Sequence, residues 1–438
     1  MDYTPHTEAE IQEMLRRVGA ESLEDLFRHL PEEILNPEIA LPEPLPEWAV
    51  LEELGRLAER NRPARKAFLG GGIRSHHAPP VVQALASRGE FLTAYTPYQP
   101  EVSQGVLQAT FEYQTMIAEL TGLEVANASM YDGATALAEG VLLALRETGR
   151  MSVLISHGVH PEYRAVLKAY LEAVGAELKV LPLEGGRTPS FPVPEGVGAV
   201  VGQNPNYLGA LEDLAPLAEA AHRAGALFVA VADPLSLGVL KPPGAYGADI
   251  AVGDGQSLGL PMGFGGPHFG YLATKKAFVR QLPGRLVSET VDAEGKRGFI
   301  LTLQAREQYI RRAKAKSNIT TNAQLTALMG AMYLAALGPE GLREVALRGV
   351  ALAHRLHDLL LEVPGVEPFT PKPFFNEFAL RLPKAPGAVR EALAARGLHA
   401  ATPVPEEYGE NLALFAATEL HQEEDLLALR EALKEVLA

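Results

Sequence analysis

Polar residues stand at the ends of several apolar runs in the middle of this chain, where side chains could act on a ligand. The runs 152–155, 199–201 and 227–232 are short and rich in apolar residues, and helical patterns separate them. This alternation predicts a mainly parallel sheet covered on both faces, which collects ligands beyond the carboxyl ends of its strands. The residues that we expect in that pocket are Asp132, Gly133 and Thr135 in a helix-opening turn, with His160, Asn204 and Asp233.

Each of these positions has a functional and an ordinary interpretation. The turn at Asp132 could form an anion pocket from the amides of a helix start, or Asp132 could simply cap the helix. His160 could stack on a ligand ring or only pack, and Asn204 lies in a common Asn-Pro-Asn turn. Asp233 ends the most apolar strand, where it could cap a turn or pair with a buried cation such as a pyridinium nitrogen.

A phosphate turn, a histidine and then an aspartate together resemble the site of aminotransferase-like, pyridoxal-phosphate-dependent enzymes of fold type I. That fold expects a Schiff-base lysine after the aspartate. The chain has no lysine between Lys241 and Lys275, and the glycine-rich segment 253–267 carries Gln256 instead. An amide cannot condense with the cofactor's aldehyde, and the Asp132 carboxylate would repel a phosphate by more than about 1 kcal/mol. We therefore predict a vestigial pocket in which the Asp132 carboxylate occupies the place of the phosphate.

Composition narrows the class of protein. With 438 residues the chain is too long for one compact core, and its net charge of −15 argues against nucleic-acid binding. It has no cysteine, which excludes disulfides and thiolate metal sites, and we expect no metal centre. It has no run of eighteen apolar residues and its N-terminus lacks the pattern of a secretory signal. We therefore expect no membrane span and a cytoplasmic location.

The pattern changes twice along the chain, which predicts three regions. Residues 1–62 combine a helical pattern with a proline-rich stretch, and we expect them to form an arm that lies on another surface. Residues 63–320 carry the alternation of strands and helices and form the large α/β domain. Residues 321–438 begin with a long helix near 323–337 and continue with helices and strand-like pieces, which predicts a smaller α+β domain.

Several longer motifs are distinctive. They occupy residues 90–105 (EFLTAYTPYQPEVSQG), 113–116, 120–123, 126–129, 283–287, 303–312 and 316–319. This set spans almost the whole chain and closely resembles the P-protein family of the glycine cleavage system. In that family some organisms carry one long polypeptide of two homologous halves, and others split it into two subunits. The chain resembles the first half, the subunit 1 form.

The resemblance implies a reaction shared between two subunits. The family places the cofactor lysine in the second half, and alignment back from Gly265-Gly266-Pro267 puts Gln256 at that position. Pyridoxal phosphate would then be bound covalently by a lysine-bearing partner, in a heterotetramer of two unlike pairs. The implied reaction is glycine decarboxylation with transfer of the aminomethyl group to the lipoylated H-protein.

The resemblance also implies a loop that reaches across an interface, since fold-type relatives build each site between two chains. The residues that we expect to face the partner's cofactor are Tyr95, Thr96, Tyr98, Gln99 and Glu101. The alternative is a proline-braced interface turn with purely structural work.

Three arginines are candidate contacts for a carboxylate or for the carrier protein, namely Arg74, Arg285 and Arg312. Arg74 follows three glycines and could equally lie in a loop that joins the arm to the domain. The run from Arg306 to Lys316 predicts a basic helix, which could line a channel for the acidic carrier, pair with internal carboxylates or be a solvated face.

Two other functions stay open at this point. The chain could be a stand-alone pyridoxal-phosphate lyase or aminotransferase that uses an unexpected lysine, such as Lys241 or Lys275. It could also be a scaffold or regulatory paralogue that kept the fold and lost the site.

Overall fold

The computed structural model describes residues 6–35, 37, 40–93 and 95–438, and the chain divides into two units, Met1–Arg62 and Pro63–Ala438. The first unit contains α1 (Glu8–Val18) and α2 (Glu47–Ala58), with short 3-10 turns between them. Thr7 caps α1 through a capping box with Glu10, and Gly19 ends it in the left-handed conformation. Whether this unit lies on another chain stays a prediction.

The second unit is built on a seven-stranded sheet with the order β2-β8-β7-β6-β5-β3-β4. The strands are β2 (Val125–Ala126), β3 (Ser152–Ser156), β4 (Glu177–Leu181), β5 (Ala199–Gln203), β6 (Leu227–Val231), β7 (Ile250–Asp254) and β8 (Gly270–Thr274). Strands β3 to β7 pair in parallel, whereas β8 runs antiparallel to both of its neighbours. The mixed, mainly parallel α/β sheet expected from the apolar runs is confirmed.

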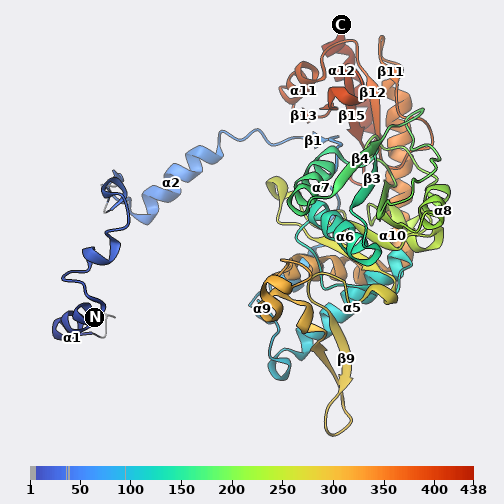
Figure 1. Cartoon of the computed structure of the whole chain (residues 1–438). Helices are drawn as coiled ribbons and strands as arrows, with labels where there is room; N and C mark the ends of the chain where they lie inside the picture. Colours follow the sequence, from blue (N-terminus) through green and yellow to red (C-terminus); the bar gives the residue numbers. More distant parts are fainter. Residues whose placement is uncertain (1–5, 36, 38–39, 94) are drawn as a thin grey trace. The chain divides into compact units, whose positions relative to one another are not determined.

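Helices cover both faces of this sheet (Figure 1). On one face α6 (Gly133–Thr148) and α7 (Pro161–Val174) pack on alternate strand residues such as Ile155 and Val229. On the other face α8 (Ala215–Arg223) packs on Val200 and Phe228, and α5 (Gln104–Thr121) packs on the β7–β8 side. Burial of both side-chain rows explains why the strands read as continuous apolar runs.

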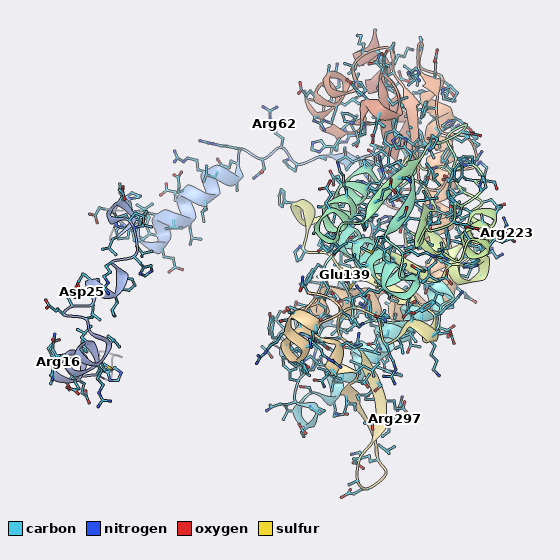
Figure 2. The ribbon with its side chains drawn as sticks, viewed as in Figure 1. Arg16, Asp25, Arg62, Glu139, Arg223 and Arg297 are labelled. Carbon is cyan, nitrogen blue, oxygen red and sulfur yellow. The ribbon has the colours of Figure 1, made fainter. Side chains whose placement is uncertain are left out.

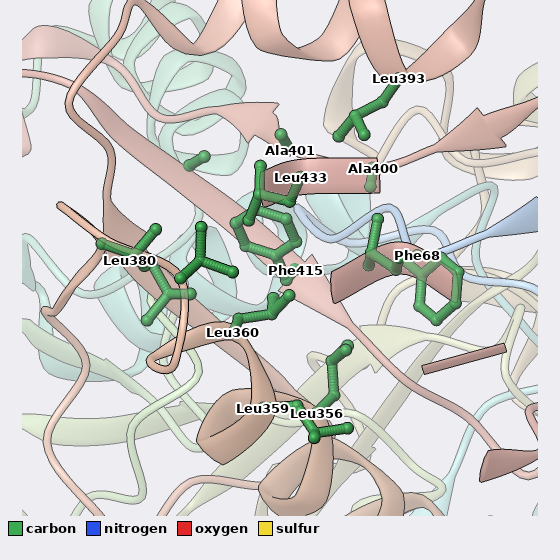
Figure 3. Packing of buried hydrophobic residues seen from close by; sticks show 14 of the residues in the cluster. Phe68, Leu356, Leu359, Leu360, Leu380, Leu393, Ala400, Ala401, Phe415 and Leu433 are labelled. Carbon is green, nitrogen blue, oxygen red and sulfur yellow. The ribbon is translucent and has the colours of Figure 1, made fainter. Parts of the chain in front are cut away.

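A second sheet forms the smaller lobe, with four antiparallel strands in the order β11-β12-β15-β14. These are β11 (Glu367–Pro368), β12 (Glu377–Arg381), β14 (Thr402–Pro403) and β15 (Leu412–Ala416), and helices α11 (Pro386–Ala394) and α12 (Glu423–Leu437) accompany them. Its core joins Phe68, Leu360 and Phe415 with Leu433 (Figure 3). β1 (Lys66–Ala67) pairs with β13 (Leu398–His399), so the start of this unit is tied to the lobe. The boundary between residues 320 and 321 stays a prediction.

Helix α10 (Gln324–Leu360) is longer than the helix expected near 323–337, and it is kinked at Gly338, just before Pro339. By length and composition alone α10 is long and apolar enough to cross a membrane. Core helices of water-soluble proteins pass the same test, and α10 packs on α3 (Pro80–Ala86), α5 and α12. This is therefore weak evidence for a membrane span.

The basic helix predicted from Arg306 to Lys316 is wrong. Only α9 (Gln308–Arg311) and two 3-10 turns (Gln304–Arg306 and Arg312–Lys314) form there. Arg312 takes a positive φ of 52° that an α-helix cannot contain. Nearby, β9 (Val287–Val291) and β10 (Arg297–Leu301) form an antiparallel hairpin. Arg297 on that hairpin is labelled in Figure 2. The remaining α-helix of this unit is α4 (Gly89–Leu92).

Candidate functional site

A cavity of about 1010 Å³ lies at the carboxyl ends of β5, β6 and β7, as expected for a sheet of this kind. The start of α6 and the loop 69–74 form further walls, and the smaller lobe contributes Asn376, Glu377 and Thr402. Both lobes of the second unit therefore enclose the cavity.

The start of α6 is occupied by the chain's own polar groups. The Asp132 carboxylate accepts a hydrogen bond from the Thr135 amide at 2.8 Å, and the Gly133 amide donates to Asp254 Oδ2 at 3.3 Å. The Tyr163 ring closes over the same turn, because a Cβ atom on Gly133 would lie 1.9 Å from its hydroxyl oxygen. Two of the amides that could bind an anion, those of Gly133 and Thr135, thus already have carboxylate partners.

Charge at this corner opposes a phosphate. Burial raises the pKa of the Asp254 carboxyl, which shows how poorly the site solvates negative charge. Burial, together with the carboxylates of Asp254 and Asp132, also raises the pKa of Tyr163 well above its ordinary value. A dianion would meet two carboxylates here. Among the described residues, Asp254 pairs with His268 Nδ1 at 3.7 Å, and neither carboxylate pairs with a lysine or arginine.

Asp233, at the end of β6, already has a cation. Its carboxylate forms an ion pair with the Arg74 guanidinium, and it accepts hydrogen bonds from Ser257 Oγ at 2.7 Å and the Leu235 amide at 3.0 Å. Arg74 also lies 3.4 Å from Glu377 Oε1, and its side chain is only 9% exposed. Burial alone would lower the pKa of Arg74, but Glu377 and Asp233 outweigh burial and raise it.

Gln256 holds Arg74 in this position. Its Nε2 donates to the Arg74 carbonyl at 2.9 Å and to the Leu260 carbonyl at 2.8 Å. Its Oε1 accepts from the Arg74 amide at 3.3 Å, and the residue is 4% exposed. The glutamine therefore fixes the backbone whose guanidinium neutralises Asp233.

His160 caps α7 and contacts the glycine loop. Its Nε2 donates to the Gly71 carbonyl at 2.8 Å, and its Nδ1 accepts from the Glu162 amide at 3.2 Å. Its ring meets Tyr207 edge-on with centroids 4.9 Å apart. These contacts fix the orientation of the ring against the glycine loop.

Asn204 lies beside the cavity and is not among the described lining residues, whereas its neighbours Gln203 and Asn206 are. The Asn204 Oδ1 accepts from the Glu212 amide at 3.0 Å, which braces the turn after β5. The structure thus gives Asn204 a local structural contact in place of the pocket position that we expected.

The loop that follows α4 lies elsewhere, and its five predicted residues are not among those that line the cavity. Tyr98 accepts a hydrogen bond from Arg285 Nη2 at 3.3 Å, and the guanidinium carbon lies 5.4 Å from its ring centre. Tyr95 is 75% exposed, and its hydroxyl lies 3.1 Å from Thr321 Oγ1. Gln99 and Glu101 are exposed, and Thr96 Oγ1 is buried without a partner among the described atoms.

Three important residues escaped the sequence analysis. Asp254 ends β7 and could have been found by the same strand-end argument that found Asp233. Tyr163 lies inside α7 and Glu377 begins β12 of the other lobe, and neither position carries a recognisable signal.

The fold is the fold type I architecture of aminotransferase-like proteins, many of which use pyridoxal phosphate, but the residues present at this chain's cavity do not fit that cofactor. An aspartate aminotransferase from Thermus thermophilus shares this fold, with a TM-score of 0.59 at 20% identity, over 85% of this chain and 98% of that one. The model of the glycine cleavage system P-protein family matches residues 1–433, and the chain belongs to that family.

Two relatives sharpen this assignment. The probable glycine dehydrogenase (decarboxylating) subunit 1 of Moorella thermoacetica is 48% identical over 445 residues, which cover both chains completely. A crystal structure of glycine decarboxylase (P-protein) of the glycine cleavage system, in inhibitor-bound form, is similar with a TM-score of 0.91 and 87% identity, again over both whole chains.

Proposed function

We propose that this chain is the subunit of a split glycine decarboxylase that carries no covalent cofactor and acts only together with a lysine-bearing partner. The complex would be a glycine dehydrogenase (aminomethyl-transferring) in the cytoplasm, with two copies of each subunit. The single observation that carries the proposal is the set of contacts around Gln256 and Arg74. An amide stands where an amine is needed, and an arginine already holds the aspartate that would pair with the cofactor.

The reaction of the complex balances without a further oxidant. The bond between the α-carbon and the carboxylate of glycine breaks, and carbon dioxide leaves. The electron pair left on the aminomethyl carbon forms a bond to one sulfur of the lipoyl disulfide on the carrier. The other sulfur leaves as a thiolate, which takes a proton from solvent and becomes a thiol. Pyridoxal phosphate, where bound, supplies the electron sink for this decarboxylation. No step is assigned to it in this chain.

The lysines of this chain support the proposal over a stand-alone enzyme. Neither Lys241 nor Lys275 is among the described residues that line the cavity. Lys275 Nζ binds Asp249 Oδ1 at 2.5 Å, just before β7 begins, whereas the cavity lies where β7 ends. An amine at the opposite edge of the sheet cannot reach a cofactor in the cavity.

The part of this chain in the reaction is to shape the partner's site. Tyr95 and Tyr98 offer hydroxyl groups on an exposed loop, and Arg285 beneath them is 3% exposed and holds Tyr98 in place. We propose that Tyr95, Thr96, Tyr98, Gln99 and Glu101 face the partner's cofactor. Arg74 has no such role, because Asp233 and Glu377 occupy its guanidinium.

The test uses the purified chain, the lysine-bearing subunit and their mixture, each incubated with pyridoxal phosphate and treated with borohydride. We expect a phosphopyridoxyl adduct on the partner alone, and release of carbon dioxide from glycine only in the mixture with the lipoylated carrier. An adduct on this chain, located by peptide mass spectrometry, would contradict the proposal. A mixture without any activity would favour a scaffold or regulatory role.

A further inference from the structure

The second unit carries a basic surface that its own carboxylates leave unpaired. We define it as the basic segment, residues 309–316, which comprises α9 after Gln308 and the turn that follows. Its cations Arg311, Arg312, Lys314 and Lys316 are all exposed, and none forms an ion pair with a described carboxylate. Tyr309 and Ile310 beside them are 42% and 50% exposed, so apolar surface accompanies the charge.

Hydrogen bonds of Arg306 and of the Lys316 amide anchor the basic segment to the rest of the chain. Arg306 donates from Nε to the Leu303 carbonyl at 3.0 Å and from Nη2 to the Gly284 carbonyl at 3.1 Å. The Lys316 amide closes the loop by donating to the Arg306 carbonyl at 3.3 Å. Arg306 is thus consumed by internal contacts, and burial lowers its pKa. Of the four exposed cations, Arg311 donates from Nε to the Ala305 carbonyl at 3.0 Å, and none of the four forms an ion pair with a described carboxylate.

The basic segment lies in space beside the loop that we propose faces the partner's site. Tyr309 meets Tyr98 edge-on with ring centroids 5.9 Å apart. On the other side of the segment, Thr321 lies against the Tyr95 hydroxyl. A protein bound to the segment would therefore stand beside the loop that contains Tyr95 and Tyr98.

The sign of the charge is also informative. The whole chain has a net charge of −15, so four unpaired cations within six residues reverse the local potential. Such a patch draws a partner of opposite sign and sets its orientation. We propose that the basic segment is the docking surface for the acidic face of the lipoyl-bearing carrier protein. This inference rests on the proposed function, because it assigns the acceptor of that reaction to a surface.

The experiment compares two matched variants in the assembled complex. One replaces Arg311, Arg312, Lys314 and Lys316 by Gln. In the control, Gln replaces Lys276, Arg280, Arg343 and Lys434, which are exposed cations outside the segment without an ion pair to a described carboxylate. kcat/KM for the lipoylated carrier is measured from low to high NaCl, and glycine decarboxylation is measured with free lipoamide as a small acceptor.

We expect the segment variant to lose roughly tenfold in kcat/KM for the carrier at low salt, with a flatter salt dependence. The control variant should stay within about twofold, as expected for surface charges outside the contact. Activity with lipoamide should be unchanged in both, and calorimetry should show weaker carrier binding to the segment variant alone.

Equal losses in the two variants, or an unchanged carrier reaction, would overturn the docking surface. A parallel loss with lipoamide would overturn it as well, because the segment would then serve the glycine chemistry itself. A variant with unchanged carrier binding but lost affinity for a short DNA duplex or for anionic vesicles would assign the patch to another polyanion. An unmodified complex that is inactive with both acceptors contradicts the proposed function instead.

Discussion

Charged groups are paired within the cavity, whereas the described cations of the basic segment beside the Tyr95–Tyr98 loop are not. In the cavity, Asp233 and Glu377 are matched to Arg74, and the amides at the start of α6 are matched to Asp132 and Asp254. On the surface, the cations of the basic segment have no carboxylate partner among the described residues. The difference suggests that the groups free to meet another molecule lie outside the inherited pocket.

Replacing Arg74 by Leu should have the largest effect, because it removes the cation that pairs with two carboxylates in the cavity. Removing one partner from a buried charge network leaves Asp233 and Glu377 uncompensated, which costs about 3–5 kcal/mol. Urea unfolding of the purified chain measures the change in the free energy of unfolding. The control is Arg297→Leu on the hairpin, whose pair with Glu289 is exposed, and it should cost less than about 1 kcal/mol. Equal costs would break the comparison.

Replacing both Tyr95 and Tyr98 by Phe tests the proposed role of the surface loop that contains them. A hydrogen bond to a charged group contributes about 1.5–3 kcal/mol, so kcat/KM for glycine in the assembled complex should fall by roughly 10- to 100-fold. Tyr170→Phe serves as the control, since Tyr170 on α7 is half-buried and packs against the core of the large sheet, away from the Tyr95–Tyr98 loop. Unchanged kinetics in the double variant would remove both hydroxyls from the reaction and leave the loop a structural role.

The pH dependence of stability tests a second buried charge contact, which lies outside the cavity between Glu419 and residues 76–77. Burial raises the pKa of Glu419, but the hydrogen bond and charge of His76 and the amide of His77 outweigh it, so the net shift is downward. A lowered carboxyl pKa adds stability above the unfolded value that is lost as the pH falls through the folded one. We therefore expect Glu419→Gln to lose about 1–3 kcal/mol at neutral pH and to flatten the acid limb of the stability curve.

The control for this measurement is Glu367→Gln, a substitution at an exposed carboxylate on β11. Thermal melts between pH 3 and 7 should show the wild-type slope for the control. A retained slope in the Glu419 variant would mean that the contact between residues 76–77 and the smaller lobe does not depend on charge.

The smallest effect on cofactor binding is expected from Gln256→Lys, which supplies the missing amine but also removes the hydrogen bonds of Gln256 to Arg74 and Leu260. Arg74 would still hold Asp233, and Asp132 and Asp254 would still occupy the start of α6, so no cofactor should bind. The absorbance of the variant near 410–430 nm, about where a protonated imine absorbs, should match that of the unmodified chain. A stable chromophore would show that the glutamine alone closes the pocket.

The sequence predicted the sheet well because both side-chain rows of β3, β5 and β6 are apolar, a pattern that few other structures produce. It predicted Asp132, Asp233 and Gln256 at the cavity because parallel strands end at one edge. The pairing of Arg74 with Asp233 and Glu377 could not be predicted, since these residues are far apart in the sequence and belong to two lobes. The basic helix failed because a single positive φ at Arg312 leaves no trace in hydrophobic periodicity.

The contacts of Arg74 also bear on how the chain matures. A cofactor that binds the folded state stabilises an enzyme whose buried charges are otherwise unpaired. In this chain the buried carboxylates of Asp233 and Glu377 already pair with Arg74. We expect the chain to reach full stability in cells starved of vitamin B6. It would then be fully folded before it binds the partner subunit, so that a shortage of vitamin B6 would limit only the partner subunit.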